Sequence, residues 1–422
     1  MRVKKQVQPC NLLIRIQFKK NFFPLFTFHF PLNYLNYFCP VMLFDPNFPE
    51  HPLYLLILLG SLASSVFIFL FYYFVFFSRL AWYKEKTPKK QRLPSVSIVI
   101  AAKNEYLNLK ENLPFILTMD YPDYEVIVVD DHSQDDTNEL LADFKLMYSR
   151  LKVLTLKDSL TFFEGKKFPL SIGIKEAKNE VLLLTDADCK PASNDWIKHM
   201  VSQYDENTEL VLGYGKFYRR KWSLLSMLVR YDTLHSAIQY FSAALSGFPY
   251  MGVGRNLSYK RRLFLESDGF TSHYDVISGD DDIFVSQHAR KKNCRICLRP
   301  QSFVYSRSKK RLGSWWHQKK RHFTTGKHYR FGTKLYLGLY HLNTLLFPAI
   351  AITVLLLKYN ILISGSLILM KVVSQWIIFG KAAGKLKEKK LLLISPILEI
   401  VFAIVNPLIH ISNMIKQPGR WK

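Results

Sequence analysis

Two aspartates one residue apart, Asp186 and Asp188, are the residues of this chain whose type and spacing most directly indicate chemistry. They follow a short apolar run, residues 181–185, whose length and composition predict a buried strand. Side chains alternate along extended backbone, so the two carboxylates emerge on the same side of the chain. Two hard oxygen ligands placed in this way can share a divalent cation such as Mg²⁺ or Mn²⁺. An ordinary polar loop is the alternative interpretation of the pair.

The elements that must position this pair are predicted from the pattern of apolar residues. Strands are expected at residues 96–101, 125–130, 153–156 and 181–185, and helices between them at about 107–119, 136–149 and 169–178. This alternation predicts an α/β fold with a mainly parallel sheet, helices on both faces, and a ligand site at the carboxyl ends of the strands. Polar residues occur there: Asn104 and Glu105 follow the first strand, and Asp130 and Asp131 the second.

Two common nucleotide-binding signatures are missing from the sequence. Neither GxGxxG in the first strand–helix turn nor GxxxxGK[ST] anywhere in the chain is found. The readings as a dinucleotide oxidoreductase or a P-loop enzyme therefore lose their main support.

The charge of the chain indicates a membrane. The formal net charge is +25, from 58 Lys and Arg against 33 Asp and Glu, and the basic residues crowd beside long uncharged runs. No zinc-finger spacing or basic zipper region is present, so we attribute the charge to topology and anionic lipid, with no nucleic-acid partner. Five scattered cysteines, including the CxxC of residues 294–297, suggest packed thiols in a reducing cytosol.

The uncharged runs predict the topology. Residues 53–77 are long enough to cross a bilayer. Six basic residues and one acid follow in 79–92, whereas two acids and no Lys or Arg occur in 42–52, so the middle of the chain is expected in the cytoplasm. After it, residues 335–357 and 361–380 are predicted to span, and residues 391–412 either cross or re-enter.

The predicted organisation therefore has four parts. They are an N-terminal extension at 1–52, a transmembrane helix at 53–78, a domain at 94–330 with an interfacial segment at 312–330, and two or three transmembrane helices in 335–413. Residues 1–41 carry six basic residues and no acid, and Met42 offers an alternative start, so we expect this region to be an upstream translation artefact.

Several motifs in the middle of the chain resemble, in order, those of family 2 glycosyltransferases with the GT-A fold. They are SIVIAAKNE, EVIVVDDHSQDDT, GKKFPLSIGI, LLLTDADCKP, GVGRNLSYKRRLF, SGDDDIF and HQKKRH. The resemblance covers roughly residues 94–330, and the flanking spans are similar to those of cellulose, hyaluronan and ceramide glycosyl transferases.

The resemblance implies a donor site for a nucleotide sugar, with UDP as the expected nucleotide. The residues it assigns to this donor are Asn104, Glu105, Asp130, Asp131, Lys167, Asp186, Gln318 and Arg321. Lys166 beside Lys167 resembles the same family lysine, and solvated surface lysines are the alternative for both. Asp186 and Asp188 would hold Mg²⁺ or Mn²⁺ against the diphosphate, stabilising the charge of the leaving group. Gln318 and Arg321 match the family's Q-x-x-R-W segment, but His322 replaces its Trp, which puts processive synthesis in doubt.

An acceptor hydroxyl must lose a proton as it displaces the nucleoside diphosphate. The resemblance places the base among Asp280, Asp281 and Asp282 and favours Asp281, with the register left open. A helix N-terminus explains one or two such acids, at about 0.3–1 kcal/mol each, but not three crowded together. Gly254 and Asn256 resemble an acceptor-side loop, for which a hairpin turn is the alternative.

The predicted function is an inverting, metal-dependent glycosyltransferase in the cell inner membrane. It would be multi-pass, with a cytoplasmic catalytic domain, and would act on a lipid or lipid-linked glycan. The enzyme alternatives are a polyprenyl-phosphate glycosyltransferase and a processive polysaccharide synthase. The alternative from another class is a nucleotide-sugar-binding membrane scaffold without activity.

Overall fold

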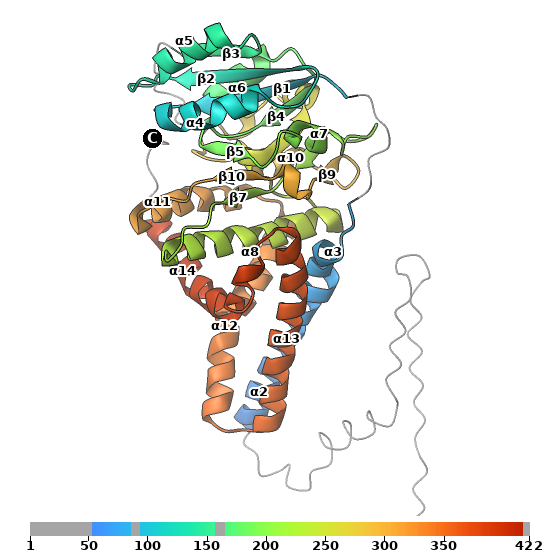
Figure 1. Cartoon of the computed structure of the whole chain (residues 1–422). Coiled ribbons are helices and arrows are strands. Elements are labelled where there is room, and N and C mark those ends of the chain that lie inside the picture. The colour runs from blue at the N-terminus through green and yellow to red at the C-terminus, as the bar shows by residue number, and fades with distance from the viewer. Residues whose placement is uncertain (1–52, 86–92, 157–164, 417–422) are drawn as a thin grey trace, which may run out of the picture. The chain divides into compact units, whose positions relative to one another are not determined.

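The computed structural model describes residues 53–85, 93–156 and 165–416, and Figure 1 shows its elements coloured along the chain. The described residues from Ile57 onward belong to one compact unit. The predicted extension at 1–52, with its alternative start at Met42, lies outside the described residues.

A seven-stranded sheet forms the centre of the domain, in the order β3-β2-β1-β4-β8-β6-β9. Its strands are β1 (Val96–Ala102), β2 (Tyr124–Asp131), β3 (Leu151–Leu156), β4 (Val181–Leu184), β6 (Leu210–Leu212), β8 (Leu257–Lys260) and β9 (Cys294–Ile296). The first four are parallel, and Val96 of β1 pairs with Tyr124 of β2 and Val181 of β4. Only β8 runs against both its neighbours, β4 and β6. The predicted mainly parallel α/β fold is confirmed.

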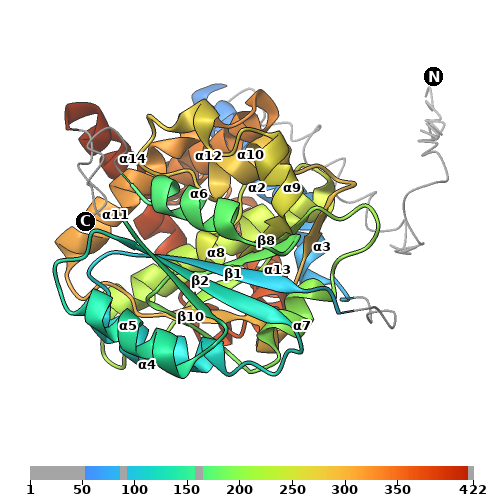
Figure 2. The same ribbon diagram turned by 90° about the horizontal axis from the view of Figure 1, so that it is seen from above.

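Helices cover both faces of this sheet, as Figure 2 shows for α4 and α5 on one side and α6 on the other. The first face carries α4 (Tyr106–Leu117), α5 (Thr137–Met147) and α7 (Trp196–Val201). The second carries α6 (Lys167–Glu176), α9 (Arg261–Glu266) and α10 (Asp282–His288). Successive side chains of β1 point to opposite faces of the sheet, so apolar residues are available on both faces. Ile98 and Ile100 pack against the first layer of helices, and Val99 packs against the second.

A second, three-stranded sheet in the order β5-β10-β7 extends the domain. Its strands are β5 (Cys189–Pro191), β7 (Gly215–Phe217) and β10 (Val304–Ser306). β5 begins one residue after Asp188, so this sheet fixes the far side of the Asp186–Asp188 turn.

Four helices of the described residues are long and apolar enough to cross a membrane, by length and composition. The first combines α2 (Leu53–Phe71), the π-helix η3 (Tyr72–Phe77) and α3 (Ser78–Ala81). The others are α12 (Phe331–Leu356), α13 (Ile361–Lys385) and α14 (Ser395–Ile415). Residues 391–412 were predicted either to cross the membrane or to re-enter it, and the structure forms a single helix of 21 residues there, α14.

The last three of these helices share a buried polar network. Glu399 of α14 accepts hydrogen bonds from Lys371 and Gln375 of α13 and from the Tyr340 hydroxyl of α12, the last at 2.8 Å. Charged groups in an apolar bundle are costly unless paired in this way. The network therefore fixes how the three helices face one another.

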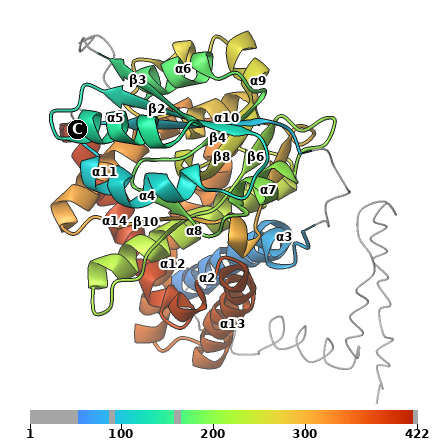
Figure 3. The ribbon, with the colours of Figure 1, turned by 45° about the horizontal axis from the view of Figure 1, so that its top comes forward.

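Two helices lie between the sheets and this bundle: α8 (Leu224–Ser246) and α11 (Leu312–Phe323), as Figures 1 and 3 show. Arg230 of α8 forms an ion pair with Glu388, just after α13, and Asp232 accepts from Lys319 of α11 at 2.8 Å. His235 contacts the Tyr340 hydroxyl at 3.2 Å. The domain that contains the two sheets thus joins the bundle through charged and polar contacts on α8.

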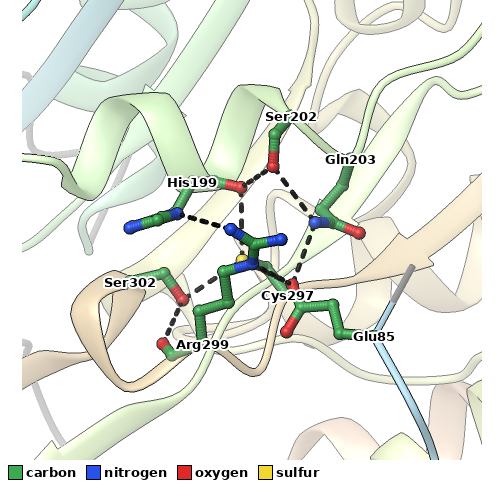
Figure 4. A network of polar contacts seen from close by, with 7 residues as sticks. All are labelled: Glu85, His199, Ser202, Gln203, Cys297, Arg299 and Ser302. Atoms are coloured by element: carbon green, nitrogen blue, oxygen red, sulfur yellow. Dashed lines mark hydrogen bonds and ion pairs between the residues drawn. The ribbon is translucent and has the colours of Figure 1, made fainter. Parts of the chain in front are cut away.

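The segment after α3 is joined to the domain by the polar network of Figure 4. Glu85 accepts a hydrogen bond from Gln203 at 2.9 Å and lies 3.6 Å from the Arg299 guanidinium. The Cys297 thiol donates to the His199 carbonyl at 3.3 Å. Cys294 and Cys297 are both free, so the CxxC forms no disulfide.

We predict that Gly173→Ala in α6 lowers the free energy of unfolding by about 1–3 kcal/mol, the usual cost of overpacking. A Cβ there would lie 2.5 Å from Val99 Cγ1 and 3.0 Å from Val129 Cγ2, because α6 packs directly on β1 and β2. The matched control is Gly313→Ala in α11, where no atom lies within 4 Å and the added methyl should favour the helix. Thermal unfolding in detergent measures both. If Gly173→Ala melts at the same temperature as the wild type, the close packing of α6 on the sheet is contradicted.

Candidate active site

The Asp186–Asp188 turn lies at the carboxyl end of β4, beside the ends of β1 and β2. The Asp186 and Asp188 carboxylates and the Cys189 thiol lie within 4.8 Å of one another. Both carboxylates are partly exposed, whereas Cys189 is buried. The strand therefore delivers two oxygen ligands to one accessible point.

A lysine already neutralises part of this charge. Lys166, at the start of α6, bonds to Asp186 and lies 3.7 Å from Asp280. Burial opposes the charged form of Asp186, but Lys166 outweighs it, with smaller contributions from Arg255 and Arg321, and holds the pKa of Asp186 below its usual value. Burial and the Asp186 charge raise the pKa of Asp188 instead. The pair thus favours an additional positive charge beside Asp188.

These donor atoms fit a hard divalent cation. Burial and the two carboxylates raise the pKa of the Cys189 thiol well above its usual value, so the thiol stays protonated and does not compete as a thiolate ligand. Two carboxylates on one turn remain, which is a donor set suited to Mg²⁺ or Mn²⁺ with further oxygen ligands from a diphosphate. The Lys166 ammonium beside Asp186 shows that this position attracts a cation.

The three acids 280–282 occupy three different environments. Asp280 faces Lys166. Asp281 is the N-cap of α10, and one of its carboxylate oxygens accepts a hydrogen bond from the Asp282 backbone N–H. The other oxygen accepts from the Gly254 backbone N–H at 2.7 Å. Burial, then Asp280 and Asp282, raise the pKa of Asp281 well above its usual range. A raised pKa makes a carboxylate a stronger base toward a proton.

Asp282 is buried and held by two hydroxyls. Thr325 and Tyr329 both donate to one carboxylate oxygen, Tyr329 at 2.9 Å. Burial raises the pKa of Asp282 to about 6, although both hydrogen bonds act in the opposite direction. Because Tyr329 lies just before α12, Asp282 connects the acid loop to the first C-terminal membrane helix.

Lys167 does not face the acids that Lys166 contacts. Its buried ammonium donates to the backbone carbonyls of His273, Val276 and Ser278, the last at 3.2 Å. Burial lowers its pKa to about 8. Gly165 lies alongside, with φ of +117°, and a Cβ there would come within 2.8 Å of the Ile277 carbonyl. Lys167 therefore holds the loop that carries the three acids, and the donor role predicted for it stays a prediction.

The residues after β1 and β2 form a second polar group. The Asn104 side chain accepts from the Gln134 backbone N–H at 2.7 Å, and the Glu105 N–H donates to the Thr137 hydroxyl at 3.1 Å. Asp131 pairs with Lys103 at 3.2 Å. Asp130 is fully buried; one oxygen accepts from Ser133, and the other has no hydrogen-bond partner among the described residues. Burial raises the pKa of Asp130.

The two predicted acceptor-side residues differ in position. Gly254 lies against the acids, where a Cβ would be 3.4 Å from both the Asp280 and Asp281 carboxylates. Asn256 is fully buried: it accepts from the Trp196 indole at 3.0 Å and donates to the carbonyls of Tyr214 and Ser302. Its amide joins β8 to both sheets, and the structure gives it no free group for a ligand.

The interfacial segment is the helix α11, followed by the 3₁₀ turn η7 (Thr325–His328). Arg321 lies within electrostatic range of Asp280, Asp186 and Asp281, which favour its charged form although burial lowers its pKa. Gln318 is partly exposed on the same helix. Arg321 therefore joins the acid cluster, and its roles and those of Gln318 in binding stay predictions.

Three residues of this site were not among those predicted to bind or react: Arg255, Thr325 and Tyr329. The Arg255 guanidinium lies over the Phe217 ring, 4.4 Å from its centroid, and donates to the Gly215 carbonyl at 3.3 Å. Its charge acts on Asp186 and Asp188. Arg255 lies inside GVGRNLSYKRRLF, so that motif carried the signal for it.

Comparison with known proteins agrees with this geometry. The model of glycosyl transferase family 2 matches residues 97–256, from β1 to the end of the Gly254 turn. The chain is 26% identical over 235 residues to poly-beta-1,6-N-acetyl-D-glucosamine synthase of Staphylococcus epidermidis, covering 55% of this chain and 54% of that protein. It is 36% identical over 111 residues to beta-monoglucosyldiacylglycerol synthase of Trichormus variabilis, covering 26% and 23%. The matches thus span about half or less of these relatives.

Among solved structures, a mannosyltransferase from Pyrobaculum calidifontis in complex with GDP-Man and Mn²⁺ is similar in fold. The TM-score is 0.54 at 20% identity, over 83% of this chain and 99% of that one. The sheet and the order of motifs agree with these matches, so residues 97–256 are a glycosyl transferase family 2 domain and the fold is GT-A.

Proposed function

We propose that this protein is a membrane-bound, inverting glycosyltransferase that moves a sugar from a nucleotide donor, UDP-linked by preference, to a lipid or lipid-linked glycan. The observation that carries the proposal is that two clusters of charged residues face each other at one edge of the sheet. Asp186 and Asp188 lie with Lys166 on one side, and Asp280 and Asp281 lie beside Gly254 on the other. This arrangement provides a diphosphate site next to a base.

The donor would bind across the ends of β1, β2 and β4. The unpaired oxygen of buried Asp130 can accept an N–H or O–H of the nucleoside, since a buried acceptor gains most from a partner. Lys166, Arg255 and Arg321 provide positive charge for the diphosphate. A divalent cation held by Asp186 and Asp188 would act as a Lewis acid on the departing nucleoside diphosphate.

The acceptor would approach over Gly254, which lacks a side chain where the acids need room. Its hydroxyl oxygen forms the new bond to the anomeric carbon as the bond from that carbon to the phosphate oxygen breaks. The proton passes to a carboxylate, for which we propose Asp281, because Asp282 is held by two hydroxyls and Asp280 faces Lys166. Displacement from the opposite face inverts the anomeric centre.

The membrane helices support the acceptor class. Four helices of the described part are apolar enough to span, and Asp282 is hydrogen-bonded to Tyr329, two residues before α12. An acid loop fixed to a membrane helix suits an acceptor presented from the bilayer. We infer a cytoplasmic position at the inner membrane from the charge distribution around residues 79–92. A processive N-acetylglucosamine polymer synthase is the second candidate, supported by the Staphylococcus epidermidis relative.

The first prediction for the active site concerns the dependence of turnover on the metal ligands. Asp188→Ala should lower release of nucleoside diphosphate at least about a hundredfold, because a lost ligand leaves the leaving-group charge unstabilised. Wild type and variant are assayed in lipid micelles with Mn²⁺, lipid extract and a panel of UDP- and GDP-sugars. The control Asp195→Ala removes an exposed carboxylate that pairs with Lys198 and should keep full activity. Donor binding without turnover in the wild type would instead support the non-enzymatic scaffold.

The second prediction separates the two adjacent lysines. Lys166→Met should raise KM for the donor roughly tenfold or more, the value of a charge-assisted bond. Lys167→Met should mainly lower the melting temperature and kcat, because it leaves three buried carbonyls without their donor. Steady-state kinetics and thermal unfolding of both variants test this. The reverse pattern would transfer the donor role to Lys167.

The third prediction is a shift of the pH profile. A base with a raised pKa places the acid limb of kcat/KM above the ordinary range of a carboxylate. Asp282→Asn removes a neighbouring negative charge and should lower the pKa of Asp281, moving that limb to lower pH. Profiles of wild type, Asp282→Asn and Asp281→Asn are compared. If Asp281→Asn keeps activity while Asp282→Asn abolishes it, Asp282 is the base.

A further inference from the structure

Two basic loops leave one edge of the three-stranded sheet side by side. β7 and β10 are parallel neighbours whose last residues, Phe217 and Ser306, face each other. Beyond these ends the chain reads YRRKWSL and RSKKRL, so each loop carries three consecutive basic residues shortly before a helix. Tyr218 connects the loops, because its N–H donates to the Ser306 carbonyl at 3.0 Å and its ring stacks on Tyr305.

The seven basic side chains of these loops are all exposed. Arg307 pairs with Glu111 at 2.7 Å, whereas the other six form no ion pair within the described part of the chain. We call them the basic platform: Arg219, Arg220, Lys221, Lys309, Lys310 and Arg311. Apolar side chains stand beside them. Trp222 is 102% exposed, Leu224 67% and Leu312 58%.

A solvated protein surface accounts for the six cations alone, but not for the apolar residues among them. Trp222 has φ of +58°, a conformation that is costly for a bulky residue and that is kept where surrounding structure or function requires it. Basic side chains combined with exposed Trp and Leu are typical of segments that lie in a membrane interface.

The two helices that begin at the platform contact the ends of membrane helices. α8 and α11 begin at the two loops and run across the bundle (Figures 1 and 3). At the far end of α8, the Leu245 carbonyl accepts from Arg79, at the end of the first candidate span. On α11, Lys320 donates to the carbonyls of Ser412 and Lys416, where α14 ends. Both helices therefore follow the boundary of the membrane region.

We propose that residues 219–224 and 309–312 form a docking surface for anionic phospholipid headgroups of the leaflet that holds α12, α13 and α14. The platform cations bind lipid phosphates, and Trp222, Leu224 and Leu312 enter the headgroup region. The surface orients the catalytic domain on the bilayer. The proposal goes beyond sugar transfer, because the membrane lipid is neither donor nor acceptor. One platform cation, Lys309, also acts on the Asp188 carboxylate of the candidate active site.

The test measures amide hydrogen exchange of the full chain in nanodiscs of phosphatidylcholine, with and without phosphatidylglycerol. Exchange of residues 218–224 should slow in anionic discs and recover at high salt, which screens exposed charges. Each basic side chain near an anionic surface is worth about a fivefold change in binding. Arg220→Gln/Lys221→Gln should therefore lose most of the protection. The control Lys110→Gln/Lys145→Gln removes the same charge from α4 and α5 and should keep it.

Three results would overturn the proposal. The first is equal exchange of residues 218–224 in neutral and anionic discs, and the second is protection that persists in Arg220→Gln/Lys221→Gln. The third is protection in neutral discs by soluble polyphosphate but none by anionic lipid, which would assign the platform to an anionic polymer. Because amide exchange needs no turnover, the outcome is independent of whether the proposed sugar transfer is correct.

Discussion

Five carboxylates, Asp186, Asp188 and the three acids 280–282, come together at the carboxyl ends of the parallel strands, and their repulsion must be balanced. The balancing cations arrive from three separate elements: Lys166 from the start of α6, Arg255 from the turn before β8, and Arg321 from α11. In a partly buried site, such opposite charges raise or lower pKa values far more than in water. The sheet, its helices and the interfacial segment must all be in place before this balance exists.

The acid loop is held from two sides by buried polar contacts. Lys167, in α6, donates hydrogen bonds to backbone carbonyls of the loop. Thr325 in η7 and Tyr329 directly after it donate to the Asp282 carboxylate. The pair Lys166–Lys167 thus serves two functions in adjacent positions: one ammonium faces the carboxylates, and the other supports the loop that carries them. A site of this kind is positioned by buried polar contacts, which are expensive to leave unsatisfied.

Much of this was accessible from the sequence, because local patterns encode strands and their polar ends. The runs at 96–101, 125–130, 153–156 and 181–185 each appear as a strand, and the Asp186–Asp188 pair lies where β4 ends. What sequence reasoning missed depends on contacts between distant segments. The local sequence does not distinguish Lys166 from Lys167. It also does not show that the Asn256 amide is hydrogen-bonded to Trp196, Tyr214 and Ser302, or that Asp282 contacts Tyr329. The three-stranded sheet, built from strands of three residues, also lacks a periodic signal.

The helix α8 has a consequence for how the protein can be divided. Its buried residues include Arg230, Tyr231, Leu234, Ile238 and Phe241, and its polar partners Glu388 and Tyr340 belong to the C-terminal region. A fragment ending before residue 331 would expose this apolar stripe and leave the Arg230 charge without Glu388. Removing the C-terminal helices would therefore leave the buried Arg230 charge without Glu388 and the Tyr231 ring without Phe402, so truncation at this point is expected to destabilise the sheet domain.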